Sequence, residues 1–157
     1  METNFLKSKI LIVDDEQANI SLLEDVLENE GYTHFRSTQD SRKTLEMYKE
    51  IRPDLVLLDL NMPYLDGFQV IEQLKEFEKN SYAPVLVLTA QSDRQTRLRA
   101  LSAGARDYIE KPFDITEVTQ RISNMLEIRL LHNQVRDQNL VLEEKVRMRT
   151  HELEETR

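Results

Sequence analysis

The sequence predicts an α/β protein, a doubly wound five-stranded parallel sheet (a flavodoxin-like arrangement) with a long C-terminal helix. Short unbroken apolar runs rich in β-branched residues and leucine recur along the chain, which is typical of strands buried on both faces. Segments with apolar residues at helical spacing alternate with these runs, as in the βαβ units of a parallel sheet. After Asp114, no Gly or Pro occurs as far as Arg157, so the last helix can continue without interruption.

The expected strands lie at residues 9–13, 33–37, 54–58, 84–88 and 107–109, of which 33–37 has a weaker strand pattern and 107–109 is short. Helices are expected between them, because leucine, isoleucine and valine recur there every three or four residues. The first helix is expected to end at Gly31, the second (about 41–51) before Pro53, and the fourth at Gly104. The third follows a loop that ends in Asp66 and Gly67. Right-handed crossovers make this an open sheet.

The last helix is too long for one domain to cover. About 40 residues at 1.5 Å per residue give roughly 60 Å, which is twice the width of a small domain. We therefore divide the chain into a compact domain at residues 1–126 and a helical extension at 127–157.

The extension carries a heptad pattern. Its apolar core positions are Ile128, Val135, Leu142, Val146 and Leu153, and its polar core positions are His132, Asn139 and Arg149. An Asn in such a seam fixes the register of two-stranded coiled coils, so we predict a homodimer through this helix. A solvated single helix is the alternative, and an 11-residue leucine spacing leaves the supercoil hand open.

The composition narrows the function. The 157 residues include 39% hydrophobic and 32% charged residues, and the net charge is −8. An acidic chain lacks the basic face that general nucleic-acid binding needs, so we expect no direct nucleic-acid contact. No apolar run approaches the ~20 residues of a membrane span, and residues 1–9 do not resemble a secretion signal. With no cysteine, the sequence fits a reducing compartment, and we expect a cytoplasmic protein with no membrane contact.

Reactive side chains follow four of the five expected strands. They are Asp14 and Asp15, Asp59, Thr89, and Lys111. Each alone has an ordinary explanation, such as a helix cap, an Asx-turn or a surface charge. Because parallel strands place their carboxyl ends at one edge of the sheet, the four positions together favour a single functional site.

The residue types at this edge indicate the chemistry. Converging carboxylates repel one another unless a cation compensates, and carboxylate oxygens without His or Cys select Mg²⁺. A nucleophilic Asp can form an acyl phosphate, and phosphoryl transfer needs charge neutralisation around the phosphoryl oxygens. We therefore expect Asp59 to be the phosphoacceptor and Asp14 and Asp15 to hold the metal. Lys111 would pair with the phosphoryl group, and Thr89 would donate a hydrogen bond to it.

Four sequence blocks resemble the signatures of the response-regulator receiver domain of two-component signalling. They read ILIVDDE at residues 10–16, LLDLNMP at 57–63 followed by Asp66-Gly67, LTA at 88–90, and YIEKP at 108–112. The resemblance extends over about residues 7–126 with order and spacing kept. It implies the CheY-like strand order 2-1-3-4-5.

The resemblance also implies roles and partners. A histidine kinase or histidine phosphotransfer protein would supply the phosphoryl group. The backbone carbonyl of Asn61 would be a further Mg²⁺ ligand beside Asp14, Asp15 and Asp59. Thr89 and Tyr108 would form the switch pair that alters the face made by the fourth helix, fifth strand and fifth helix. The Lys111–Pro112 peptide bond would often be cis.

Other readings of the site are weaker. A Mg²⁺-dependent phosphatase of the haloacid-dehalogenase type also uses an Asp nucleophile. Such enzymes carry an Asp-x-Asp motif after the first strand, whereas here two adjacent aspartates, Asp14 and Asp15, follow it. A nucleotide-binding enzyme needs a glycine-rich loop, and Gly31, Gly67 and Gly104 are not clustered.

We expect the chain itself not to be an enzyme. It ends within an amphipathic pattern, so we expect either an output domain beyond residue 157 or a stand-alone regulator. Residues 142–155 resemble linkers that join receivers to HD-GYP phosphodiesterase or sensor-kinase modules.

Overall fold

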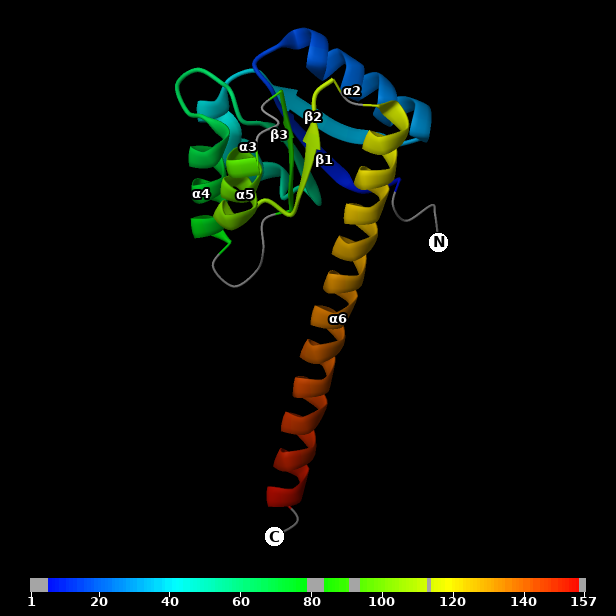
Figure 1. Ribbon diagram of the computed structural model, residues 1–157. Helices are drawn as coiled ribbons and strands as arrows, with labels where there is room; N and C mark the ends of the chain where they lie inside the picture. Colours follow the sequence, from blue (N-terminus) through cyan, green and yellow to red (C-terminus); the bar gives the residue numbers. More distant parts are fainter. Residues whose placement is uncertain (1–5, 79–83, 91–93, 113, 156–157) are drawn as a thin grey trace.

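The fold is a five-stranded parallel sheet with helices on both faces, followed by one long helix (Figure 1). The computed structural model describes residues 6–78, 84–90, 94–112 and 114–155. The strands, in chain order, are β1 (Lys9–Val13), β2 (His34–Thr38), β3 (Leu55–Asp59), β4 (Val85–Thr89) and β5 (Asp107–Glu110). Their order in the sheet is β2-β1-β3-β4-β5, which confirms the predicted fold class and strand order.

The strand boundaries differ from the expected ones by about one residue. Asp59 and Thr89 are the last residues of β3 and β4, rather than the first residues after them. The parallel register continues to these residues, since Asp59 pairs with Leu88 and Thr89 pairs with Glu110. Both side chains are therefore held by the sheet itself and not by a loop.

In the described part of the chain, six helical segments connect and follow the strands. They are α2 (Gln17–Glu30), the short 3-10 helix η1 (Ser41–Lys43), α3 (Thr44–Ile51), α4 (Gly67–Phe77), α5 (Arg94–Ala103) and α6 (Ile115–Glu155). The helix expected at 41–51 begins as η1, because the Asp40 side chain accepts a hydrogen bond from the backbone of Arg42 and tightens the first turn. The α2 helix ends at Gly31, whose φ of 97° is readily available to glycine.

The core has two apolar layers, one on each face of the sheet. On one face α2 and α6 pack against the strands, and Leu23 and Ile122 belong to this layer. On the other face α3, α4 and α5 pack, with Tyr48, Leu74 and Ala100 in the layer. Since both faces are covered, the central strands β1, β3 and β4 are almost continuously apolar, whereas the edge strand β2 (HFRST) has no buried residue.

The α4 helix begins with a reciprocal cap just after the loop that follows Asp59. The Asp66 carboxylate accepts a hydrogen bond from the backbone N–H of Gln69, and the Gln69 side chain accepts one from the N–H of Asp66, both at 2.9 Å. Replacing Asp66 with Ala is expected to lower the free energy of unfolding by ~1 kcal/mol, the usual cost of losing an N-cap. Urea denaturation measures this loss, and the exposed Glu72→Ala on the same helix is the control. An Asp66→Ala protein as stable as the control would show that the cap contributes nothing.

The α6 helix extends far beyond the sheet, as predicted (Figure 1). Its first turns are buried against the strands through Val118, Ile122 and Leu126. From Gln134 to Met148, every residue whose side chain is described is exposed. Among the described residues, no helix is long and apolar enough to cross a membrane.

Candidate functional site

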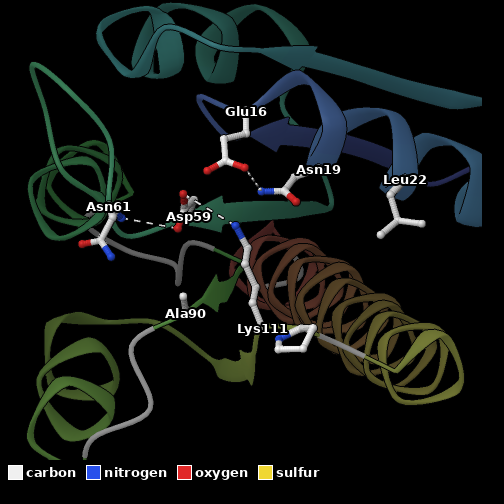
Figure 2. A pocket seen from close by; sticks show the side chains of 8 residues that line it. Glu16, Asn19, Leu22, Asp59, Asn61, Ala90 and Lys111 are labelled. Carbon is white, nitrogen blue, oxygen red and sulfur yellow. Dashed lines mark hydrogen bonds and ion pairs between the residues drawn. The ribbon is translucent and has the colours of Figure 1, made fainter.

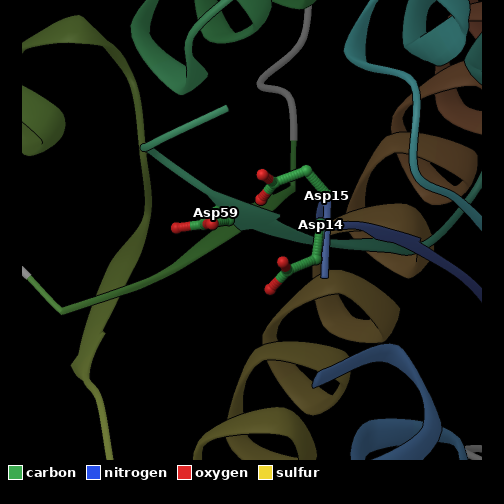
Figure 3. A group of neighbouring side chains, drawn as sticks. All are labelled: Asp14, Asp15 and Asp59. Atoms are coloured by element: carbon green, nitrogen blue, oxygen red, sulfur yellow. The ribbon is translucent and has the colours of Figure 1, made fainter. Parts of the chain in front are cut away.

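Three carboxylates meet at the carboxyl edge of the sheet (Figure 3). Asp14 and Asp15 directly follow β1, and Asp59 ends the neighbouring strand β3. One oxygen of each carboxylate lies within 4.8 Å of the others. Asp14 is 2% exposed and Asp59 is 7% exposed, while Asp15 is half-buried. The sequence expectation that these carboxylates lie together is thus met by the geometry.

Lys111 brings a positive charge to the carboxylates from the loop after β5. Its ammonium Nζ donates a hydrogen bond to Asp14 Oδ2 at 2.9 Å and lies 3.6 Å from Asp59 Oδ2. Its backbone N–H donates to the carbonyl of Thr89 at 2.7 Å, and the following peptide bond to Pro112 is cis. Lys111 is thereby anchored to the end of β4 and reaches Asp14 after β1 and Asp59 at the end of β3. Figure 2 shows its approach to Asp59.

Several groups around Asp59 affect the pKa of its carboxyl. Burial raises the pKa of its carboxyl to about 6, and the negative charges of Asp14 and Asp15 contribute in the same direction. The Lys111 ammonium and a hydrogen bond from the backbone N–H of Asn61 oppose this increase in pKa. Lys111 alone therefore does not offset the desolvation and repulsion at this position, and a second cation would lower the pKa further.

The site opens into a pocket of about 440 Å³. Its lining includes Asp59, Asn61, Ala90 and Lys111 from the loops and strand ends at the edge of the sheet. Figure 2 shows the side chains of Lys111 and Asp59 facing each other here. A small phosphate compound or a partner's side chain has room to approach Asp59 by this route.

The donor set fits Mg²⁺. The cluster offers only carboxylate oxygens, from Asp14, Asp15 and Asp59, and no sulfur or imidazole nitrogen belongs to it among the described residues. Hard oxygen ligands in a small number, with room beside them for water or phosphate, are what Mg²⁺ requires.

The remaining expected residues lie on the same edge or close to it. Thr89 is fully buried at the end of β4, next to the strand that ends in Asp59. Asn61 is exposed and lines the pocket, and its N–H lies 3.4 Å from Asp59 Oδ1. Tyr108 on β5 is 7% exposed, and the Arg97 guanidinium lies 5.8 Å from the centroid of its ring. Tyr108 therefore points inward in this structure.

The residues predicted from the sequence did not include Asn19 and Leu22 of α2, which also line the pocket. Glu16, Asn19 and Leu22 line it, and the Asn19 amide donates a hydrogen bond to Glu16 at 3.4 Å. Glu16 is the N-cap of α2, and Asn19 and Leu22 follow it at a spacing of three residues, which places them along one side of this helix. That spacing is the sequence pattern from which their position beside the site could have been predicted. The pairing of Lys111 with Asp14 was also missed, since sequence gives no distance between residues so far apart.

Comparison with known proteins gives the family. The family model of the response regulator receiver domain matches residues 10–123. The chain is 42% identical over 120 residues to the probable transcriptional regulator ycf27 of Porphyridium aerugineum, covering 76% of this chain and 48% of that protein. It is 37% identical to the DNA-binding dual master transcriptional regulator RpaA of Synechocystis, covering 75% and 48%. The chain thus spans about half the length of these relatives.

Comparison with solved structures gives the same family. A chain in the crystal structure of the CheX–CheY–BeF3–Mg²⁺ complex from Borrelia burgdorferi superposes with a TM-score of 0.69. It is 30% identical in sequence, and the match covers 74% of this chain and 87% of that one.

The family leaves the haloacid-dehalogenase alternative without support. The expectation of no nucleic-acid contact is likewise unsupported, because RpaA is a DNA-binding protein. The chain belongs to the response-regulator receiver family, the phosphorylation-based signalling domains of two-component systems.

Proposed function

We propose that Asp59 accepts a phosphoryl group, with Mg²⁺ bound, from a histidine kinase or a histidine phosphotransfer protein. The observation that carries this proposal is the position of Asp59 in the pocket, where its carboxylate lies beside those of Asp14 and Asp15 and 3.6 Å from the ammonium of Lys111. The solved chain from Borrelia was crystallised with BeF3 and Mg²⁺, which supports the same chemistry here.

In this scheme an Asp59 carboxylate oxygen attacks the phosphorus of the donor's phosphohistidine. The new O–P bond forms as the N–P bond breaks, and the electron pair of that bond returns to the imidazole nitrogen. Mg²⁺, when bound, neutralises charge on the phosphoryl oxygens. Asp14, Asp15, Asp59 and the backbone carbonyl of Asn61 would hold it.

The side chains around Asp59 complete the site. Lys111 exchanges its contact with Asp14 for one with the phosphoryl group, since a phosphoryl group carries more negative charge than a single carboxylate. Thr89 donates its hydroxyl to a phosphoryl oxygen. Its movement leaves space for Tyr108 to turn, which changes the face formed by α5, β5 and α6. The proposed signalling unit is therefore a receiver at residues 1–126 followed by the helical extension at 127–157.

The phosphoacceptor role is tested by incubating the full chain with Mg²⁺ and acetyl phosphate and measuring the intact mass. We expect the mass of one phosphoryl group to be added, and we expect no addition in Asp59→Asn or after chelation of the metal. Lys111→Ala is expected to slow incorporation, whereas the exposed Lys75→Ala on α4 is the charge-matched control and should not. Incorporation that persists in Asp59→Asn would refute the assignment.

We also propose that the protein is a homodimer and that it is cytoplasmic. The exposed apolar residues of α6 support a homodimer joined through this helix, with phosphorylation controlling an output. The absence of cysteine fits the proposed cytoplasmic location. Because the matched relatives are about twice as long, the output is proposed to belong to a further domain or a separate protein.

A further inference from the structure

The receiver covers one side of α6 beyond the apolar contacts between them. Among the described residues, Leu126 is the last one of α6 that is fully buried. Three partly buried polar residues continue the same side of the helix at spacings of three and four residues, and they are Arg129, His132 and Asn133. At least one polar atom of each is buried, including Nε and Nη1 of Arg129. The covered part of α6 therefore ends in polar contacts.

Arg129 is the residue through which α6 contacts the amino edge of the sheet. Its Nε lies 3.9 Å from Asp54 Oδ1, and its side chain is 14% exposed. Asp54 directly precedes β3, whose last residue is Asp59. The contact therefore lies at the end of β3 that is opposite to the phosphoacceptor site.

The Asp54 carboxylate is a firmly held partner for Arg129, because its other contacts are made with the sheet. Its Oδ2 accepts a hydrogen bond at 2.9 Å from the backbone N–H of Lys9, the first residue of β1. The backbone N–H of Asp54 donates to the carbonyl of Lys9 at 2.7 Å. Since β1 and β3 are neighbours inside the sheet, the carboxylate cannot follow a moving helix without losing these hydrogen bonds.

The charge of Arg129 also acts on the opposite layer of the core. Tyr48 of α3 is 1% exposed, and its hydroxyl donates a hydrogen bond to Glu78 at 3.0 Å. Burial and the neighbouring Glu78 carboxylate raise the pKa of Tyr48, whereas the positive charge of Arg129 opposes this increase. Arg129 thus reaches toward the layer that contains α3, although α6 packs on the other face of the sheet.

We propose that the contact of Arg129 with Asp54, which we name the α6 latch, sets the direction in which the rest of α6 leaves the receiver. Apolar packing, such as that of Leu126, is non-directional and lets a helix tilt, whereas the α6 latch ties one point of α6 to the sheet. Any output joined to α6 would take its position from this direction. The inference depends neither on the phosphoacceptor role nor on a second copy of the chain.

The length of α6 makes its direction measurable. Without the α6 latch, the last fixed point of the helix is Leu126. From Leu126 to Met148 the helix is roughly 33 Å long, so a tilt of about 10° moves Met148 by roughly 6 Å. Distances between two spin labels, one on the receiver and one at Met148, record such a movement.

The chain has no cysteine, so pairs of introduced cysteines carry the labels in the full chain. One pair is Glu28→Cys on α2 with Met148→Cys, and the other is Glu72→Cys on α4 with Met148→Cys, since α2 and α4 lie on opposite faces of the sheet and all three positions are exposed. An excess of unlabelled protein restricts the measurement to distances within one chain. We expect Arg129→Ala to shift or broaden the distance distribution of at least one pair by about 5 Å or more, and Arg129→Lys, which keeps the charge, to have a smaller effect.

Arg121→Ala is the matched control. Arg121 also lies on α6 and pairs with the receiver, with its Nη1 2.7 Å from Asp107 Oδ1, but it lies near the beginning of the helix. Its removal should change the distances to Met148 by less than about 2 Å. A third label pair, Glu28→Cys with Glu72→Cys, shows in each variant whether the receiver itself keeps its structure.

Unchanged distances to Met148 in Arg129→Ala would overturn the inference, and so would changes of equal size in Arg121→Ala. If the distance between the labels at Glu28 and Glu72 also changes in Arg129→Ala, then Arg129 stabilises the receiver as a whole and the inference is again wrong. The phosphoacceptor role is unaffected by any of these results, because the intact-mass measurement tests it separately.

Discussion

Replacing Asp59 with asparagine is expected to make the metal-free protein more stable at pH 7, although the substitution removes the phosphoacceptor. The buried carboxyl has a pKa raised to about 6, mainly by desolvation, whereas an unfolded Asp titrates near ~3.9. The folded protein therefore binds the proton more tightly than the unfolded chain does. Its stability falls as the pH rises from about 4 to about 6, and the full penalty is present above pH 6.

The size of this penalty follows from the difference between the two pKa values. One pKa unit corresponds to ~1.4 kcal/mol, so a shift of this size, reduced for relaxation of the site, gives roughly 2 kcal/mol. Asparagine has nearly the same shape and carries no charge to desolvate. Asp59→Asn should thus gain about that much free energy of unfolding at pH 7 and almost nothing at pH 4.

Urea denaturation of both proteins at pH 4, 5, 6 and 7 with a chelator present measures this effect. Other groups titrate in the same range, but they are common to both proteins, and the difference between the two isolates Asp59. Adding Mg²⁺ at pH 7 should stabilise the wild-type protein and have a much smaller effect on Asp59→Asn, because binding to the folded state is what stabilises. A stability difference that does not vary with pH would contradict the account of the Asp59 electrostatics.

Replacing Gly67 with alanine is expected to be strongly destabilising and to disturb the phosphoacceptor as well. A Cβ on Gly67 would lie 2.7 Å from the backbone carbonyl oxygen of Asp59 and 2.7 Å from the Cα of Leu60. Both atoms belong to the backbone at the end of β3, so no side-chain rotation relieves the overlap. The first turn of α4 or the end of β3 must move.

Overpacking of this kind costs typically 1–3 kcal/mol, and the backbone contacts place Gly67→Ala near the upper end, at about 3 kcal/mol. For a domain of this size, that loss corresponds to a decrease in Tm of roughly 6–12 °C. Phosphorylation by acetyl phosphate should also slow, because the displaced atom is the carbonyl of the phosphoacceptor residue itself.

Gly31→Ala is the matched control. Gly31 ends α2 with a φ of 97°, so alanine there is strained by its backbone conformation at a cost of ~1 kcal/mol. Gly31→Ala should therefore lower stability to a smaller degree and leave phosphorylation at the wild-type rate. Equal effects of the two substitutions on phosphorylation would mean that the contact of Gly67 with Asp59 has no special importance.

Local patterns in the sequence were enough to predict the α/β architecture and to bring the residues of the candidate site together at one edge of the sheet. Residues 10–13 and 55–58 are continuous apolar runs because both faces of the sheet are covered, and that burial is visible in the composition of each run. Parallel strands place their carboxyl ends together, so Asp14 and Asp59 could be assigned to one edge before any distance was known. These inferences depend on local patterns and on strand direction only.

Three other features of the protein become visible only in the tertiary structure. Lys111 contacts Asp14 more closely than Asp59, the pKa of Asp59 is raised to about 6, and Arg121 of α6 pairs with Asp107 of β5. Each depends on where the packed core places groups from different elements, such as Lys111 and Asp14, which are far apart in sequence. Distances of a few ångströms and the exclusion of water set these energies, and neither is encoded in the order of residues along a single segment.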